Sequence, residues 1–325
     1  MEFDVILNPK GMESTYIDHL NLSFGQWGDI ALYKWCFNRP VGDLKADIMI
    51  FKNDDRIVAG SAVTYRTVLL GGSIIHVGIM TGSWTLPEAR GQGCFTRIIE
   101  TSLSLASRKK AALLLAFVTE KNASFRRLAR AGSSLFPTHY LFSDRNTPVP
   151  ESSHIISPVS DVRNGIETVF EKLRRHQDGF AHFAYTLKEW ESQFLKRPGT
   201  IEFLNVDDIG PVIIEKKGNF DRVLVLPVKE EPVFVDCVKA LLKRALMNGQ
   251  NLFLFTTSPS WKDECLKMGF GYSPGYLTAL VADAKELTKA CPGVSALPGN
   301  IVHRLYEPAG PWYIGPWNIQ SGDRM

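Results

Sequence analysis

Apolar and polar residues alternate with two different periods along this chain, and the changes of period predict the order of its elements. The apolar run Ile74–Met80, which continues toward Trp84, is typical of a buried strand. After it, apolar side chains recur at the spacing of one helix face, at Phe95, Ile98, Ile99, Leu103 and Ala106. The pattern predicts a helix from Phe95 to about Lys109, a strand from Ala112 to Val118, and a second helix that opens at Asn122 and ends at Gly132.

The same order of elements recurs in the second half of the chain. There the pattern predicts strands at Pro211–Ile214 and Arg222–Leu226, a helix at Val233–Met247, a strand at Leu252–Thr256, and a helix at Trp261–Met268 followed by Gly269. Prolines and small polar residues interrupt all periodicity between Asp144 and Pro158. We therefore expect two similar units in tandem, residues 1–150 and residues 151–325, each built from strands and helices.

The segment between the first strand and its helix reads Thr85-Leu86-Pro87-Glu88-Ala89-Arg90-Gly91-Gln92-Gly93. Two glycines leave the backbone open to a ligand, and the helix that follows begins with N–H groups that have no partner within the helix. Such a helix start binds anions, because the helix dipole is positive there. We expect a pyrophosphate at this place, with Arg90 either fixing the loop or adding positive charge.

Three kinds of phosphate loop fit a strand–glycine–helix arrangement. A nucleoside-triphosphate loop needs Gly-Lys-Ser/Thr, but Gly93 is followed by Cys94 and Phe95. A dinucleotide fingerprint would place its third glycine at Thr96, and its acidic partner would be Glu120, which comes too late. The third kind binds coenzyme A, with the pyrophosphate on the helix and the amide-bearing arm along the strand edge.

The pattern Thr85-x-Pro87-x-x-Arg90-Gly91-x-Gly93 resembles the acetyl-CoA loop of the GNAT superfamily of N-acetyltransferases, and the helix, strand and Asn-initiated helix after it are similar too. The resemblance implies a mixed α/β (α+β) fold with a largely antiparallel sheet flanked by helices, in two tandem copies. It also implies acetyl-CoA as cofactor. The positions implied to bind it are Ser83, Trp84, Thr85, Arg90, Gly91, Gln92, Gly93, Cys94, Phe95, Thr96 and Asn122.

The chain departs from the family pattern at two positions. Phe95 stands where the family has Gly or Ala, so the backbone is less open there or the ring packs under the helix. The family tyrosine that protonates the departing thiolate would fall at Ala129. Tyr140, on the strand after Gly132, is our candidate for a replacement acid. His76 and His139 are further candidates for acid–base work.

In this family, segments near both ends of the chain lie close to the site where the acceptor binds. The segment from Leu20 to Phe37 is expected to form one or two helices that cover the acceptor side of the cleft. Similar tandem acetyltransferases return their C-terminus to the first domain, and in one branch the terminal carboxylate is the base. This makes Asp323 and the Met325 carboxylate candidates here. A tail that only packs on the protein body is the simpler alternative.

The second copy lacks the phosphate loop. Its helix is preceded by Pro227-Val228-Lys229-Glu230-Glu231-Pro232, which has no glycine, two carboxylates that would repel a pyrophosphate, and a proline that removes an N–H group. We therefore predict a degenerate second copy and one coenzyme per chain.

Composition excludes several classes of protein. A net charge of +3 without a basic stripe argues against a nucleic-acid partner. The 5 cysteines are scattered and form no metal motif or disulfide framework, so no metal site is predicted. Cys94 is interpreted as a small apolar filler. The absence of a leader and of an apolar run of about 18 residues predicts no membrane segment and a cytoplasmic location. The oligomeric state stays open.

These inferences define one main hypothesis and two alternatives. The main hypothesis is an acetyltransferase that moves the acetyl group of acetyl-CoA to a primary amine of a small molecule, such as an amino sugar, an amino acid or an antibiotic-like amine. The second copy would contribute to the acceptor side. The first alternative uses a longer acyl chain carried by CoA or an acyl carrier protein. The second is a CoA-binding module without turnover.

Overall fold

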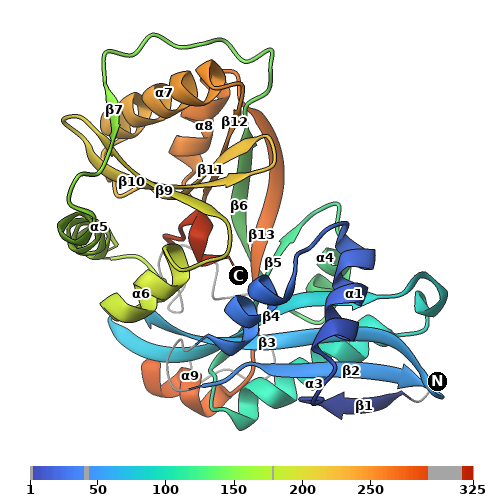
Figure 1. Cartoon of the computed structure of the whole chain (residues 1–325). Helices are drawn as coiled ribbons and strands as arrows, with labels where there is room; N and C mark the ends of the chain where they lie inside the picture. Colours follow the sequence, from blue (N-terminus) through green and yellow to red (C-terminus); the bar gives the residue numbers. More distant parts are fainter. Residues whose placement is uncertain (1–2, 40–43, 178, 292–316, 325) are drawn as a thin grey trace. The chain divides into compact units, whose positions relative to one another are not determined.

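The computed structural model describes residues 3–39, 44–177, 179–291 and 317–324. The chain forms two compact units. Unit 1 contains the described residues of Met1–Phe136 and Leu277–Gly315, and unit 2 contains those of Pro137–Tyr276 and Pro316–Met325. The chain passes between the units within β6 (Ser134–Phe142) and again within β13 (Gly271–Val281) (Figure 1). This partition differs from a cut at residue 150, because the second half of β6, from His139 to Phe142, pairs with a strand of unit 2.

The sheet of unit 1 is largely antiparallel. Its strands are β1 (Asp4–Leu7), β2 (Asp47–Asn53), β3 (Arg56–Leu70), β4 (Ser73–Thr85) and β5 (Leu113–Thr119), in that spatial order, followed by the end of β13. The first four strands pair antiparallel, whereas β5 is parallel to β4. A parallel neighbour needs a crossover, and the helix between β4 and β5 supplies it.

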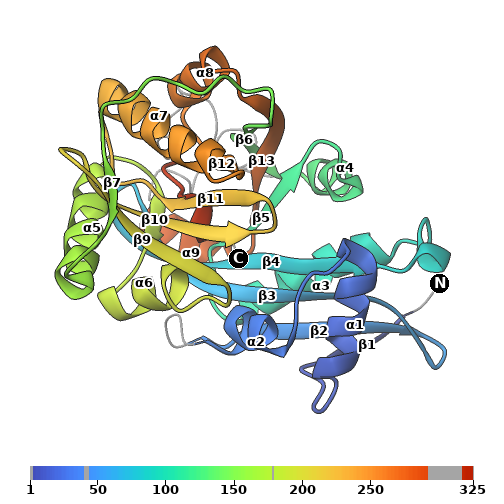
Figure 2. The same ribbon diagram turned by 45° about the horizontal axis from the view of Figure 1, so that its top comes forward.

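Helices cover both faces of this sheet (Figures 1 and 2). They are α1 (Glu13–Phe24), α2 (Ile30–Tyr33), η1 (Lys34–Asn38), α3 (Cys94–Arg108), α4 (Ala123–Arg130) and α9 (Ala284–Ala290). Gly78 of β4 leaves room for Ala106 of α3, and Gly82 leaves room for Leu20 of α1. The N-terminal helical segment is longer than expected, because it starts at Glu13 and breaks only after Phe24.

Unit 2 has a sheet of the same kind. Its strands are β7 (Ile156–Pro158), β9 (Thr200–Val206), β10 (Gly210–Lys217), β11 (Phe220–Val225) and β12 (Asn251–Thr256), together with β6 and the start of β13. The short strand β8 (His182–Ala184) does not belong to this series. The spatial order runs from the start of β13 through β6, β12, β11, β10 and β9 to β7. Its helices are α5 (Val162–His176), α6 (Leu187–Phe194), α7 (Glu231–Met247) and α8 (Pro259–Lys267). No helix in the described part of the chain is long and apolar enough to cross a bilayer.

The predicted repetition of elements is present in the structure. The series β4–α3–β5–α4 in unit 1 matches β11–α7–β12–α8 in unit 2, and in both series the two strands are parallel. Both second helices end in a left-handed glycine, Gly132 with φ 87° and Gly269 with φ 85°. The residue after each glycine donates to a carbonyl five residues back. The mixed, largely antiparallel fold expected from the sequence is thus confirmed.

The C-terminal segment Trp317–Arg324 packs within unit 2. The Gln193 side chain donates to the Gly322 carbonyl at 2.5 Å, and the Leu226 amide donates to Gln320 Oε1 at 3.1 Å. Residues 317, 319 and 320–323 are buried. The tail expected to pack on the protein body does so in this part, while Pro311–Pro316 and Met325 lie outside the described residues.

The packing of the C-terminal segment predicts the effect of adding one methyl group at Gly322. A Cβ at position 322 would overlap the ring of Phe194, which is completely buried. Gly322→Ala should therefore reduce the free energy of unfolding by about 1–3 kcal/mol, the usual cost of overpacking. Urea unfolding measures it. In a Phe194→Leu background the added methyl group should cost clearly less, and an equal cost in both backgrounds would contradict the proposed contact.

Candidate functional site

Strands β4 and β5 separate toward the end of β4, just before the glycine loop. They pair only between Val77–Ile79 and Leu113–Leu115, although β4 continues to Thr85. On its other edge, β4 carries a bulge, because Gly82 and Ser83 together lie opposite Ser61 of β3. Gly82 has φ 61°, a conformation that favours glycine. A bulge bends its strand, so the end of β4 leaves its backbone groups on the β5 side without a sheet partner.

The loop leads into a helix whose first backbone N–H groups are not capped by a side chain in the described part of the chain. A short turn, η2 (Pro87–Ala89), follows β4, and Gly91 and Gly93 have φ 82° and 88°. Helix α3 begins at Cys94, with Gly93 as its N-cap. Among the described residues, no side chain caps this helix and its first turn holds no acid. Its first four N–H groups, from Gly93 to Thr96, are therefore free to bind an anion.

These features line one cavity of about 440 Å³ in unit 1. It contains all but one of the residues predicted to bind the coenzyme, namely Ser83, Trp84, Thr85, Arg90, Gly91, Gly93, Cys94, Phe95, Thr96 and Asn122. The exception is Gln92, whose side chain is exposed and donates to the Glu88 carbonyl at 2.9 Å. The Gln92 amide is also engaged, with the Ala89 carbonyl at 3.4 Å.

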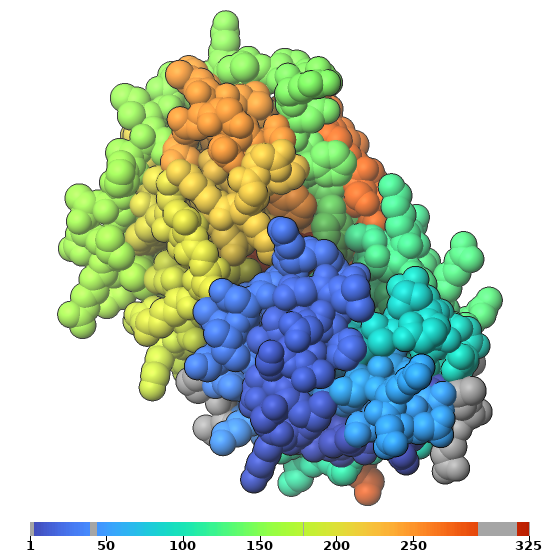
Figure 3. Space-filling view, turned by 45° about the vertical axis from the view of Figure 1, so that its right-hand side comes forward, coloured from blue at the N-terminus to red at the C-terminus, as the bar shows by residue number. Residues whose placement is uncertain are grey.

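The sequence analysis missed six residues that line this cavity, which are Ser23, Phe24, Ala89, Ala123, Ser124 and Arg127. Ser124 and Arg127 lie close to Asn122 on the first turns of α4, so helical spacing from Asn122 could have found them. Ser23 and Phe24 come from the end of α1, far away in the sequence. In the space-filling view, the dark-blue N-terminal helices adjoin the cyan segment near the loop (Figure 3).

Three predicted side chains have local roles that the structure defines. Arg90 Nε donates to the Thr85 carbonyl at 3.4 Å and so fixes the loop to the strand end. Cys94 is buried, which raises the pKa of its thiol, and this favours the predicted role of an apolar filler over that of a nucleophile. Asn122 precedes α4 but makes no capping hydrogen bond with its side chain, which leaves its amide group available at the cavity.

A histidine that the sequence analysis did not single out lies beside this cavity. The ring of His19, on α1, stacks on Trp84 with the centroids 4.5 Å apart and 19° between the planes. His19 lies one helical turn before Ser23, which lines the cavity. Burial lowers the pKa of His19 below its ordinary value, and this effect outweighs the carboxylates of Asp18 and Glu88. The imidazole is therefore neutral at pH 7 and can accept a proton.

The catalytic candidates from the sequence occupy other places. His76 is exposed and lines a separate hollow of unit 1 with Lys110 and Glu286. Tyr140 lies on β6 in unit 2, with its ring 5.3 Å from that of Phe255. The other two described candidates also lie in unit 2.

Those two side chains already have partners. His139 Nδ1 is hydrogen bonded to the Tyr272 hydroxyl at 3.2 Å. Asp323 is buried and accepts hydrogen bonds from the Tyr185 hydroxyl at 3.0 Å and from the Gln320 amide at 2.7 Å. These bonds give each side-chain oxygen of the buried Asp323 a hydrogen-bond partner inside unit 2. Met325 lies outside the described residues. The roles of Tyr140, Asp323 and Met325 in catalysis stay predictions.

A comparison with protein families matches the larger part of unit 1 to a known domain. Residues 9–126 match a family model described as an acetyltransferase (GNAT) domain. This segment is a GNAT acetyltransferase domain. It includes α1, the strands from β2 to β5, the glycine loop, α3 and Asn122. The resemblance stated from the loop residues is thereby confirmed, and the matched segment contains the open helix start.

Solved structures show the same fold over most of the chain. A probable N-acyltransferase of Enterococcus faecalis V583 is 14% identical, with a TM-score of 0.61 over 99% of this chain and 83% of that one. Myristoyl-CoA-bound N-myristoyltransferase of Saccharomyces cerevisiae is 12% identical, with a TM-score of 0.59 over 86% and 82%. A tandem GNAT protein from the clavulanic acid pathway is 12% identical, with a TM-score of 0.57 over 87% and 99%. A search of curated protein sequences gave no match.

Proposed function

We propose that this protein is an N-acyltransferase that transfers the acetyl group of acetyl-CoA to a primary amine of a small molecule. The observation that carries the proposal is the uncapped start of α3 beside the separated strands β4 and β5, within a GNAT domain. The CoA pyrophosphate would bind the amides from Gly93 to Thr96. The pantetheine amides would pair with the free edge of β4 near its bulge. Such thioesters are available in the cytoplasm.

The cavity favours a short acyl group over the long one of the alternative hypothesis. The Trp84 side chain is 3% exposed, and its indole occupies the space that a Cβ at Gly60 would need. Tyr16 and His19 pack against the same indole. A close-packed aromatic cluster under the strand end offers little room for a long chain. We therefore propose acetyl as the group that is transferred.

The chemistry requires one proton transfer from the acceptor. The amine nitrogen attacks the thioester carbonyl carbon, a C–N bond forms, the C–S bond breaks, and CoA leaves as a thiolate that takes up a proton. A backbone N–H at the β4 edge would stabilise the oxygen charge. We propose neutral His19 as the base that removes the proton from the amine, directly or through one water. Tyr140 stays the predicted acid.

Unit 2 is proposed as a degenerate copy that contributes to the acceptor side and binds no coenzyme. Its equivalent helix, α7, has Glu230 as N-cap and Glu231 and Pro232 in its first turn. Two carboxylates repel a pyrophosphate, and the proline removes one of the amides that would bind it. We therefore propose one coenzyme per chain.

Replacing Thr96 by glutamate tests the coenzyme site. A carboxylate at this position suits the helix start, so the melting temperature of Thr96→Glu should equal or exceed that of the wild type. The same charge repels the pyrophosphate, and we expect CoA affinity by calorimetry to fall at least about tenfold. Thr96→Gln is the matched neutral control and should bind CoA normally.

A thiol-release assay with acetyl-CoA and a panel of small amines then tests turnover. Release that Thr96→Glu lowers in step with CoA affinity supports the enzyme. CoA binding without release across the panel would instead favour the non-catalytic module, and equal CoA binding by all three proteins would refute the proposed site.

Replacing His19 tests the proposed base. His19→Phe keeps an aromatic ring on Trp84 but cannot accept a proton, so kcat should fall about 100-fold with little change in the KM for acetyl-CoA. Because the pKa of His19 lies below the ordinary value of about 6.5, the wild-type rate should rise with pH through a midpoint below that value. In His19→Phe the rate should not show this rise with pH. His76→Phe is the control, and a pH profile unchanged in His19→Phe would exclude His19.

A further inference from the structure

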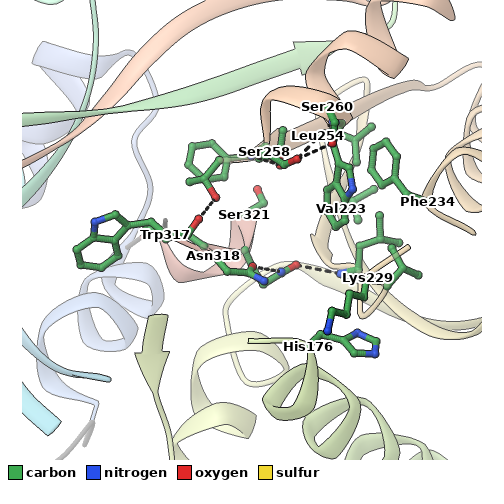
Figure 4. A pocket seen from close by; sticks show the side chains of 18 of the residues that line it. His176, Val223, Lys229, Phe234, Leu254, Ser258, Ser260, Trp317, Asn318 and Ser321 are labelled. Carbon is green, nitrogen blue, oxygen red and sulfur yellow. Dashed lines mark hydrogen bonds between the residues drawn. The ribbon is translucent and has the colours of Figure 1, made fainter. Parts of the chain in front are cut away.

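Unit 2 has its own cavity where its parallel strands separate. Strands β11 and β12 pair only between Phe220–Arg222 and Asn251–Phe253, and then diverge. The C-terminal segment closes the gap, because the Thr257 hydroxyl donates to the Trp317 carbonyl and the Leu226 amide donates to Gln320. A cavity of about 370 Å³ remains between the strand ends, the start of α7, the start of α8 and the tail (Figure 4). This volume is within the range of small-molecule sites.

One wall of this cavity is apolar and aromatic. Val223, Phe234 and Leu254 are buried and face the cavity together (Figure 4). Trp261 stacks on Phe234 with the ring centroids 4.2 Å apart, which fixes both rings. A rigid wall of this kind suits an aromatic or branched apolar group, because such a group fills the space without ordering the protein further.

A buried hydroxyl in the same cavity has no partner. Ser321 is 4% exposed, and its Oγ makes no hydrogen bond with any described residue. Figure 4 shows Ser321, on the tail, below the hydroxyl pair of Ser258 and Ser260, which bond to each other at 3.1 Å. A buried hydroxyl without a partner lowers the stability of the folded chain. A polar group on a bound molecule would remove this cost.

The charged residues that line the cavity are of opposite sign. Lys229 and Glu231 both line it and are exposed, and neither forms an ion pair with another described residue. Burial, together with nearby Lys172 and Lys229, lowers the pKa of His176, so this residue adds no charge at pH 7. A purely anionic ligand would meet Glu231 without compensation, and a purely cationic one would meet Lys229.

We propose that this cavity binds a free α-amino acid with an aromatic or branched apolar side chain. The side chain would lie on the wall of Val223, Phe234 and Leu254. The carboxylate would pair with Lys229 and the ammonium with Glu231, while the Ser321 hydroxyl bonds to one of these polar groups. The proposal concerns binding to unit 2 and does not depend on acyl transfer in unit 1.

Calorimetry on the full chain with three compounds tests the charge requirement. L-Phenylalanine carries both charges, 3-phenylpropionate only the carboxylate, and 2-phenylethylamine only the ammonium. L-Phenylalanine should bind at least about tenfold more tightly than either analogue, since each analogue leaves one charged side chain without its partner. Equal binding of an analogue, or no heat with L-phenylalanine at millimolar concentration, would overturn the proposal.

Variants locate the binding and separate it from effects on folding. Ser321→Ala removes a hydroxyl without a protein partner, so the melting temperature of the free protein should be equal or higher, whereas the rise caused by L-phenylalanine should shrink. Lys229→Ala and Glu231→Ala should each weaken binding about tenfold, and Lys239→Ala, on α7 but not in this cavity, should not. Wild-type affinity in Ser321→Ala and Lys229→Ala would place any binding elsewhere and overturn the assignment.

Discussion

The unpaired amides at the start of α3 are the feature on which the rest of unit 1 depends. They exist because Gly93 enters the helix in a left-handed conformation and no side chain among the described residues caps it. The bulge at Gly82 turns the end of β4, and Arg90 fixes the loop to the Thr85 carbonyl. The arrangement holds several N–H donors in place at the helix start, which is the geometry that favours anions at such positions.

The two units share one backbone plan and differ in the residues placed on it. Both have parallel strands that separate before a helix start. In unit 1, glycines leave that gap open to a cavity lined by the helix start. In unit 2, Glu231 and Pro232 begin the helix, and the tail from Trp317 onward closes the gap. The same backbone geometry therefore leaves an uncapped helix start beside a cavity in one unit and an apolar cavity lined by two opposite charges in the other.

The path of the chain makes the two halves of the sequence dependent on each other. In unit 1, β5 lies beside the end of β13, and the Thr278 hydroxyl donates to the Ala116 carbonyl at 3.3 Å. In unit 2, β12 pairs with the part of β6 that contains Tyr140. Residues 1–150 alone would leave an edge of β5 without its partner strand, and exposed edges promote aggregation. The stability of each sheet therefore depends on strands from both halves of the sequence.

The sequence by itself determined the elements and the glycine loop, because helical and strand periodicity, a left-handed glycine and an uncapped helix start are local properties. It predicted β4, α3, β5 and α4 to within a few residues, and ten of the cavity residues. Only the tertiary structure decided that β13 completes the first sheet, that Ser23 and Phe24 reach the loop, and that His19 stacks on Trp84. These are contacts between distant residues, and periodicity records which face of an element is buried but not what covers it.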